Sequence, residues 1–475
     1  MTLKKKISLA IFLPVISFFI CTSLQAKGLE YKEFDVRFTN PQCADYVYPE
    51  PIRNVDDTKD LFQKPANTYC SGLDSRRNSG RKGTPSEKLK QWVQDTNTKE
   101  IFLAFLSWSN SYMTKVICNE INSRPEDNLL KITALIDGDT AKLDWLKNEC
   151  VDEERRDLIQ YEKRGHKGGI NYAHNKMFLV NPNGDSEYLQ FTFGSGNFSS
   201  GIHLHHENWN FVTVKRESYF AQGHLCLMNG MLDHHYKKKA YSDYLRDCLA
   251  EAREKYEPED DISFYFVPSY FAYDLTNRVV NKIEDPDTEE ILIAAHRFSY
   301  WKFIEPLRDR LSWESNKPRP CVHMIFDDDM YWTQQEWKKV GDNTTWEARR
   351  VEMLQRFGAK ARFVQTNHHG GHFVHHNKVF IFNTHNHRYN AETDTWHEAS
   401  LEKLQEDGAA VLTGAANFTH TAYGDKGHTP NFENIYYIEI PEIAKKYKEQ
   451  YVHLWENLAT PPGDMPEWDM EPVRD

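Results

Sequence analysis

The sequence predicts an α/β protein made of two similar repeats, each a mixed β-sheet flanked by helices, related by a pseudo-two-fold axis around one active site. Three pairs of similar segments predict this duplication. Glu100–Ala104 resembles Glu290–Ala294, and a His-Asn-Lys segment and a Gly-x-x-Asn-Phe segment then recur in the same order. Because the pairs keep their order along a chain of 475 residues, we expect the two halves to fold alike.

Residues 1–26 are expected to be a signal peptide. Lys4–Lys6 precede the apolar run Ile7–Cys21, and Ala26 is a small residue suited to cleavage. A lipid-modified N-terminus at Cys21 is the alternative, although the bulky residues just before it fit that poorly. No later stretch approaches the roughly 20 apolar residues that span a bilayer. We therefore expect a secreted or periplasmic protein with no transmembrane segment in the mature chain.

The first repeat, with an N-terminal extension, is expected at residues 27–255, and the second at residues 256–475. The charged run Glu251–Asp261 is the expected junction between them. Each repeat alternates helical patterns with short runs of β-branched and aromatic residues, which is typical of layered α/β domains. The predicted strands of the first repeat include residues 101–106, 130–136, 176–180 and 211–214.

A helix is predicted between Pro85 and Asp95. Thr84 and Glu87 form a capping box, and Pro85 occupies the first helical position. The apolar positions 89, 92 and 93 share one face of this helix. The preceding stretch Ser71–Gly83 is rich in Gly, Ser and Arg, so we expect a loop there.

Seven cysteines remain after cleavage of the signal peptide, and in an oxidising compartment they tend to pair. Cysteines adjacent in the sequence are plausible partners, which leaves Cys321 without one. The alternative is that all are buried free thiols. The expected disulfides are Cys43–Cys70, Cys118–Cys150 and Cys226–Cys248.

The repeated His-x-Lys pairs carry the predicted chemistry. In a strand from Ala173 to Val180, alternation would place His174 and Lys176 on one side, and the same holds for His376 and Lys378. One neutral imidazole can attack phosphorus, while the other, protonated, protonates the departing alkoxide. The two lysines can stabilise the charge on the non-bridging oxygens. This chemistry needs no metal or cofactor, and we expect neither.

Asparagine and glutamate residues complete each predicted set. The amides of Asn197 and Asn417 can hold phosphate oxygens, and a glycine three residues before each lets the backbone approach the phosphate. Glu207 and Glu433 follow farther along, each with Asn next to it. A carboxylate at these positions can hydrogen-bond the second imidazole nitrogen and fix its tautomer.

These residues resemble the phospholipase D superfamily, whose hallmark is a duplicated His-x-Lys motif followed by a Gly-x-x-Asn segment. The resemblance spans roughly residues 84 to 440. It implies that His174 is the nucleophile and His376 the general acid. Asn181 and Asn383 depart from the family motif, which has Asp five residues after Lys. Some family members that lack this Asp remain phosphodiesterases, so the departure bears on substrate class more than on chemistry.

A phospholipid at a membrane surface is the expected substrate, and hydrolysis of its head-group phosphodiester the expected reaction. Secretion, an acidic chain and 63 aromatic residues favour this interpretation. Loss of three lysines with the signal peptide would take the formal charge from −12 to −15. That charge disfavours the alternative, a secreted nuclease acting on DNA or RNA. A non-catalytic binding protein is disfavoured because both motif copies are intact, and the sequence does not indicate an oligomeric state.

Other residues near the motifs offer further possibilities. Asp137 and Asp327 end repeated strands, and we expect them to be structural rather than catalytic acids. Arg297, Tyr300 and Trp301 are candidates for a substrate pocket. A zinc site is another alternative, but the spacing of the remaining histidines fits no zinc motif and each His-x-Lys pair would place a cation beside the metal. These histidines are His203, His205, His206, His368, His369, His372 and His375.

Overall fold

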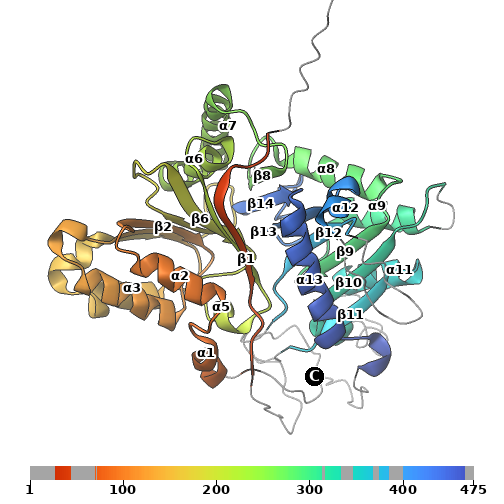
Figure 1. Ribbon diagram of the computed structural model, residues 1–475, viewed down its shortest axis with the longest axis horizontal. Helices are drawn as coiled ribbons and strands as arrows, with labels where there is room; N and C mark the ends of the chain where they lie inside the picture. The colour runs from red at the N-terminus through yellow and green to blue at the C-terminus, as the bar shows by residue number, and fades with distance from the viewer. Residues whose placement is uncertain are drawn as a thin grey trace, which may run out of the picture.

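The computed structural model describes residues 27–43, 70, 72–312, 316–332, 346–366, 374–384 and 400–465. The predicted signal peptide and His368, His369 and His372 lie outside these residues. The described chain forms two mixed β-sheets with helices on their outer faces and between them (Figure 1). The predicted α/β architecture with two similar halves is thereby confirmed.

The first sheet has seven strands, of which three neighbours at one edge run parallel and the others antiparallel. It contains every strand predicted for the first repeat. In spatial order the strands are β1 (Tyr31–Phe38), β7 (Asn208–Lys215), β6 (Tyr188–Gly194), β5 (Lys176–Val180), β2 (Glu100–Phe105), β3 (Lys131–Ile136) and β4 (Ile159–Lys163).

The second sheet repeats this order and adds one short strand at the far edge. Strands that correspond in position also agree in direction, because the matching three neighbours are again parallel. This shared topology is direct evidence for the duplication that the motifs predicted. In the matching order the strands are β8 (Ile262–Val267), β14 (Glu433–Ile438), β13 (Ala410–Gly414), β12 (Lys378–Phe382), β9 (Glu290–Ala295), β10 (Cys321–Asp327), β11 (Lys360–Val364) and β15 (Ala459–Thr460).

The central strands are buried on both faces, as parallel sheets covered by helices require. Along β2, Ile101 and Leu103 face an outer core, whereas Phe102 and Ala104 face the core between the two sheets. Strand β9 shows the same alternation. The inner core therefore joins the two repeats into one packed body. It fixes the positions of the strand ends of one sheet relative to those of the other.

Helices form the outer and middle layers (Figure 1). Helices α2 (Pro85–Gln94) and α3 (Ser111–Ser123) cover the outer face of the first sheet. Helices α8 (Ala272–Glu284), α9 (Trp301–Leu311) and α11 (Trp346–Arg356) cover that of the second. Helices α6 (Tyr219–Asp233), α7 (Lys238–Lys255) and α13 (Pro441–Asn457) pack in the inner core. Shorter helices are α4 (Ala141–Trp145), α5 (Gly201–Leu204) and α12 (Leu401–Glu406).

The predicted helix after Thr84 is confirmed as α2. The Thr84 hydroxyl accepts a hydrogen bond from the Glu87 amide, and the Glu87 carboxylate accepts one from the Gly83 amide. The loop predicted before it is wrong in part, because α1 (Gly72–Asn78) lies there. Asp74 in its first turn pairs with Arg77 in its last turn, an arrangement that suits the helix dipole.

The three predicted disulfides are all present, joining Cys43 to Cys70, Cys118 to Cys150 and Cys226 to Cys248. Cys321 is the free thiol; the residue is exposed overall, but desolvation of its sulfur raises the pKa to about 11. Three disulfides fit a protein of an oxidising compartment.

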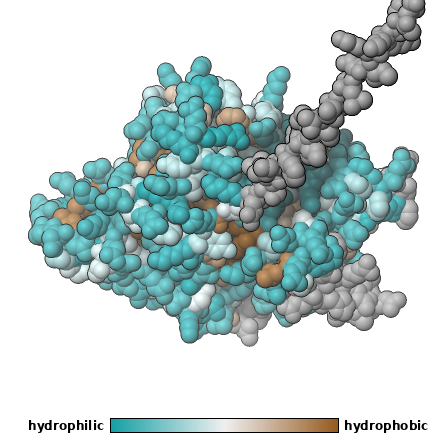
Figure 2. Space-filling model, turned by 45° about the horizontal axis from the view of Figure 1, so that its top comes forward, coloured by the Kyte–Doolittle hydropathy of each residue, from teal (hydrophilic) through white to brown (hydrophobic). Residues whose placement is uncertain are grey.

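The outer surface is mostly polar on the face shown in Figure 2, with hydrophobic residues in small separate areas. Among the described residues, no helix combines the length and the apolar character needed to cross a bilayer.

Candidate active site

The segments that carry the two histidines are held by the opposite repeat. Tyr172 and His174 exchange backbone hydrogen bonds of 2.8 and 3.0 Å with Phe432. Likewise, the His376 amide donates to the carbonyl of His206 at 3.0 Å. The predicted strand from residue 173 is therefore too long: β5 begins at Lys176, because the preceding backbone pairs across the interface rather than within its own sheet.

Asp137 and Asp327 position these segments. The Asp137 carboxylate accepts a hydrogen bond from the Ala173 amide, one residue before the first histidine. The Asp327 carboxylate accepts one from the His375 amide at 2.9 Å, one residue before the second. Both acids are buried and engage backbone groups, in agreement with the structural role expected for them.

Each glutamate lies at the histidine of the other repeat. Nδ1 of His174 is hydrogen-bonded to Oε2 of Glu433 at 2.9 Å. Nδ1 of His376 lies 2.9 Å from Oε1 of Glu207, but without the alignment of a hydrogen bond. A carboxylate at Nδ1 favours the tautomer whose Nε2 carries a lone pair, which leaves Nε2 available for chemistry.

The two lysines lie beside the histidines and are almost fully buried. Nζ of Lys176 donates to the carbonyl oxygen of His174 at 2.6 Å, and Nζ of Lys378 donates to that of His376 at 2.7 Å. Burial lowers the pKa of Lys176 to about 7, and burial together with the neighbouring Lys176 lowers the pKa of Lys378 well below its usual value. An anion bound here would offset the repulsion between the two cations.

Asn197 and Asn417 lie in the turns that follow β6 and β13. Both side-chain oxygens are buried and make no hydrogen bond in the described part of the chain. The turns require glycine, because φ is +155° at Gly194 and +139° at Gly414. A Cβ atom at either glycine would lie 2.2 or 2.3 Å from a backbone oxygen.

Burial controls the protonation of the two imidazoles. It lowers the pKa of His174, and the Glu433 carboxylate partly reverses that shift. Burial also lowers the pKa of His376 well below its usual value, and the neighbouring Lys378 lowers it further. Both imidazoles are therefore mainly neutral at neutral pH in the free protein, and a bound anion would favour protonation of one of them.

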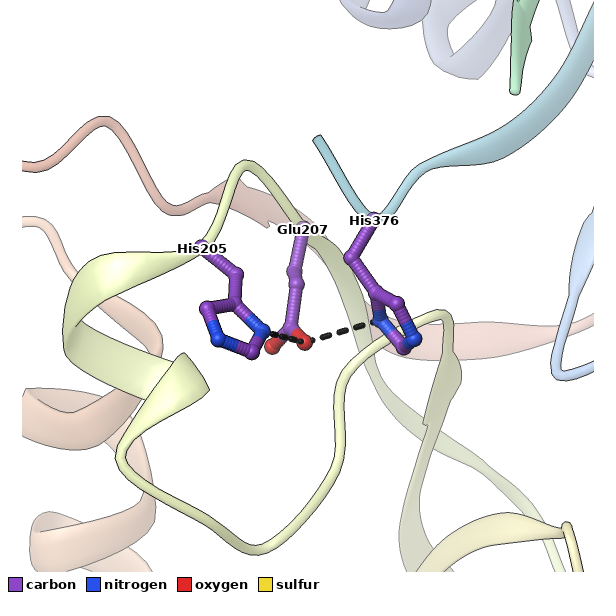
Figure 3. Close-up of side chains that lie close together, drawn as sticks. All are labelled: His205, Glu207 and His376. Atoms are coloured by element: carbon purple, nitrogen blue, oxygen red, sulfur yellow. Dashed lines mark hydrogen bonds and ion pairs between the residues drawn. The ribbon is translucent and has the colours of Figure 1, made fainter. Parts of the chain in front are cut away.

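Histidines outside the His-x-Lys motifs have separate places. His205 lies next to Glu207, with Nδ1 3.2 Å from the same Oε1 atom that His376 approaches. Figure 3 shows the Glu207 carboxylate between the two imidazole rings. His296 lies beside His376, with ring centroids 5.0 Å apart. Nδ1 of His203 lies within hydrogen-bond distance of a hydroxyl group of α1 and of one in the turn that follows it.

Two asparagines connect the two repeats by hydrogen bonds. Each follows one of the predicted glutamates, and the sequence alone gives neither a role. Asn434, after Glu433, accepts a hydrogen bond from the Lys176 amide at 3.0 Å. Asn208, after Glu207, donates to the Asn377 side chain at 3.2 Å. The repeated Glu-Asn dipeptide was the signal that marked them.

The three residues predicted to line a substrate pocket in the second repeat lie in different environments, one in the core and the others nearer the surface. Tyr300 is fully buried and stacks on Tyr423, so its assignment to a pocket is wrong. Arg297 is half exposed and forms an ion pair of 3.4 Å with Glu347. Trp301 begins α9, where the Arg350 guanidinium lies over its ring.

No protein-family model matches the sequence, and none of the curated proteins compared with it matches either. Among solved structures, yeast tyrosyl-DNA phosphodiesterase is similar at 13% identity with a TM-score of 0.43, over 74% of this chain and 87% of that one. Nuc from Salmonella typhimurium, described as a phospholipase D family member, gives 18% and 0.27, over 42% of this chain and 96% of that one. NucT from Helicobacter pylori gives 15% and 0.27, over 42% and 98%.

The departure from the phospholipase D motif lies away from the histidines. Asn181 and Asn383 follow β5 and β12 and have φ values of 48° and 50°, a conformation that Asn tolerates better than most residues. Their side-chain oxygens accept hydrogen bonds from backbone amides, including that of Glu100 at 3.0 Å and that of Glu289 at 3.0 Å. At these two positions asparagine therefore has a structural part in the turn.

Proposed function

We propose that the chain is a secreted phosphodiesterase of the phospholipase D type, which cleaves its substrate through a covalent phosphohistidine. The observation that carries the proposal is the convergence of two buried histidine–lysine pairs, each histidine having a carboxylate 2.9 Å from Nδ1. Two histidines with carboxylates suit a reaction that needs one nucleophile and one proton donor.

The proposed reaction has two steps. Nε2 of His174 attacks phosphorus and forms the N–P bond, while the P–O bond to the leaving group breaks and Nε2 of His376 gives its proton to the departing oxygen. His376 then removes a proton from water, and the resulting hydroxide attacks phosphorus and breaks the N–P bond. The assignment of attack to His174 follows the superfamily resemblance, since the two sets are nearly equivalent.

The remaining residues of the site have supporting parts. Lys176 and Lys378, with the amides of Asn197 and Asn417, stabilise charge on the non-bridging oxygens, a contribution of about 100-fold or more for one such donor. The glutamates orient the imidazoles and stabilise their charged forms. The buried lysines and amides supply these contacts without a metal ion.

A phospholipid head-group phosphodiester is the proposed substrate. Exposed aromatic side chains lie at and just before the start of α8, with Tyr270, Phe271 and Tyr273 exposed by 52, 43 and 44%. Lys302 lies over the Tyr273 ring and pairs at 2.6 Å with Asp425, in the loop that follows Asn417. Exposed aromatic side chains at the rim of a site suit contact with a lipid surface.

A nuclease remains the second candidate because of one specific feature. A cleft of about 820 Å³ near the first Asn motif is lined by Arg76, Lys115, Lys142 and Trp145, and no carboxylate is among its lining residues. None of these three cations makes an ion pair with the part of the chain that the structure describes. Cations beside an exposed aromatic ring are the features that bind single-stranded nucleic acid.

Trapping the intermediate tests the proposed chemistry. Bis(p-nitrophenyl) phosphate would be mixed with the protein, quenched in alkali and mapped by mass spectrometry. We expect one phosphorylated histidine, at His174, that is absent in His174→Ala. The same experiment on His376→Ala should accumulate the adduct, because hydrolysis lacks its base. Turnover of the ester without any phosphohistidine in either protein would refute the mechanism.

Substrate class is tested by comparing choline release from phosphatidylcholine vesicles with cleavage of single-stranded DNA. If the lipid proposal holds, Tyr273→Ala lowers choline release from vesicles and leaves hydrolysis of the soluble ester unchanged. The paired variant Lys115→Glu/Lys142→Glu is the matched control. Cleavage of DNA that falls in this variant, with no choline release by the wild type, would favour the nuclease.

A further inference from the structure

The two halves of the site differ at one position. Asn431 and His205 each lie two residues before a glutamate, so they are equivalent under the pseudo-two-fold symmetry. In one half the Asn431 amide donates to Oε1 of Glu433 at 2.9 Å, and His174 is hydrogen-bonded to Oε2. In the other half an imidazole takes the place of this amide, and both imidazoles approach the same oxygen of Glu207.

Hydrogen bonding is complete in one half and incomplete in the other. Nδ1 of His376 and Oε2 of Glu207 are both buried and make no hydrogen bond within the described residues. Buried polar atoms almost always have a partner, and an exception is a sign of a bound water or ion. Since the equivalent pair His174–Glu433 is hydrogen-bonded, the difference belongs to the half that contains His205.

The geometry of this half matches a transition-metal site. Oε1 of Glu207 lies 3.2 Å from Nδ1 of His205 and 2.9 Å from Nδ1 of His376, and one ligand atom from each residue lies within 4.8 Å of the others. Ligands at about 2.0–2.1 Å from a tetrahedral zinc ion are roughly 3.3 Å apart. Two imidazoles and one carboxylate are also a ligand set that zinc accepts while keeping a fourth position open.

We propose that His205, Glu207 and His376 form an inhibitory site for Zn²⁺ or a similar transition-metal ion. The inhibition rests on the proposed phosphodiesterase function, whereas the binding does not. A metal bound through Nδ1 of His376 uses the lone pair of that atom and leaves the single ring proton on Nε2. Giving this proton to the leaving group would produce an imidazolate, and Nε2 has no lone pair with which to accept a proton from water. Nearby Lys378 opposes the cation, so we expect reversible rather than permanent occupancy.

Binding is tested on the full-length mature protein with Co²⁺ alone, whose visible absorption reports tetrahedral coordination. We expect one Co²⁺ per chain, displaced by Zn²⁺. The decisive variant is His205→Asn, which gives this half the residue that the other half already has. It should keep its metal-free rate and lose at least about 100-fold in metal affinity, because it lacks one direct ligand.

A matched control is His420→Asn, which removes a partly buried imidazole that pairs with Asp425 and is not one of the three proposed ligands. It should bind Co²⁺ as the wild type does. Absence of Co²⁺ absorption in the wild type at millimolar metal, or Zn²⁺ inhibition that is unchanged in His205→Asn, would overturn the site. Normal Co²⁺ binding by a protein that cleaves no phosphodiester would instead refute the proposed function and leave the metal site standing.

Discussion

His174 of the first repeat is hydrogen-bonded through Nδ1 to Glu433 of the second, across 2.9 Å. The opposite arrangement brings Glu207 of the first repeat to 2.9 Å from His376 of the second. Neither repeat therefore contains a complete histidine–carboxylate pair. The packing of the two inner sheet faces is consequently a condition for the proposed chemistry, because it determines the distance between each imidazole and its carboxylate.

The first prediction concerns the four central side chains. Alanine at His174, Lys176, His376 or Lys378 should each lower kcat by at least about 100-fold, because each change removes a proton donor, nucleophile or charged hydrogen-bond donor from one phosphate site. Circular dichroism should show folded proteins. His420→Ala is the control, with near-normal turnover. Near-normal turnover in His174→Ala beside an inactive His376→Ala would contradict a single shared site.

The second prediction concerns the pH profile of kcat/KM, which should be bell-shaped since one imidazole acts neutral and the other protonated. Glu433 raises the pKa of His174 against the effect of burial. Glu433→Gln removes that effect, so the pKa of His174 falls and the limb that reports it moves to lower pH. Glu439→Gln, at the residue that directly follows β14 and pairs with Arg278, is the control and should leave the profile unchanged.

A limb that moves to higher pH in Glu433→Gln would contradict the crosswise pairing. So would an equal shift in the Glu439→Gln control. The shift can be measured independently of turnover by following the His174 imidazole resonances by NMR.

The third prediction separates an inhibitory metal from a catalytic one. EDTA should leave the rate of metal-free protein unchanged and should restore the rate of protein inhibited by Zn²⁺. The reason is that two lysines already supply positive charge, and two amide groups supply hydrogen-bond donors, for the oxygens of the phosphate. Activity that disappears on chelation and returns with zinc or calcium would identify a metallohydrolase.

The fourth prediction concerns the disulfides. Thiol titration of the denatured, unreduced mature protein should find one group, Cys321, and reduction should lower the melting temperature. Closing loops of this length stabilises a protein by about 2–4 kcal/mol for each bridge. Replacing Cys118 and Cys150 together by alanine should lower the melting temperature, whereas Cys321→Ala should change it little. Seven titratable thiols before reduction would contradict the assignment.

Sequence patterns predicted the structural features that are encoded within short segments of the chain. The motif pairs indicated the duplication, and Thr84 with Glu87 indicated a helix, because these signals lie within short segments. The pairing of Glu433 with His174 depends on how two sheets pack, which no local pattern encodes. Helix α1 was missed because its Gly, Ser and Arg content resembles a loop, although the disulfide of Cys70 restrains the chain just before it.

The asymmetry of the site is also visible in the sequence. Aligning the two Glu-Asn dipeptides places His205 opposite Asn431. Its consequence required the structure, since only the coordinates show that His205 and His376 approach the same carboxylate oxygen. Because the two halves are equivalent, the half with Asn431 shows how the half with His205 would be arranged if it also had asparagine at that position.

The last prediction tests the covalent mechanism and the lipid substrate together. With phosphatidylcholine as substrate, ethanol should yield phosphatidylethanol beside phosphatidic acid. A phosphohistidine at His174 can be released by water or by a small alcohol, and in both cases His376 removes the proton of the attacking hydroxyl group. The product ratio should therefore follow the ethanol concentration while choline release changes little, as expected when formation of the intermediate limits the rate. Choline release without phosphatidylethanol at high ethanol would argue for direct attack by water. Absence of choline release, with cleavage of single-stranded DNA that falls in Lys115→Glu/Lys142→Glu, would instead make the chain a nuclease that uses the same two histidines.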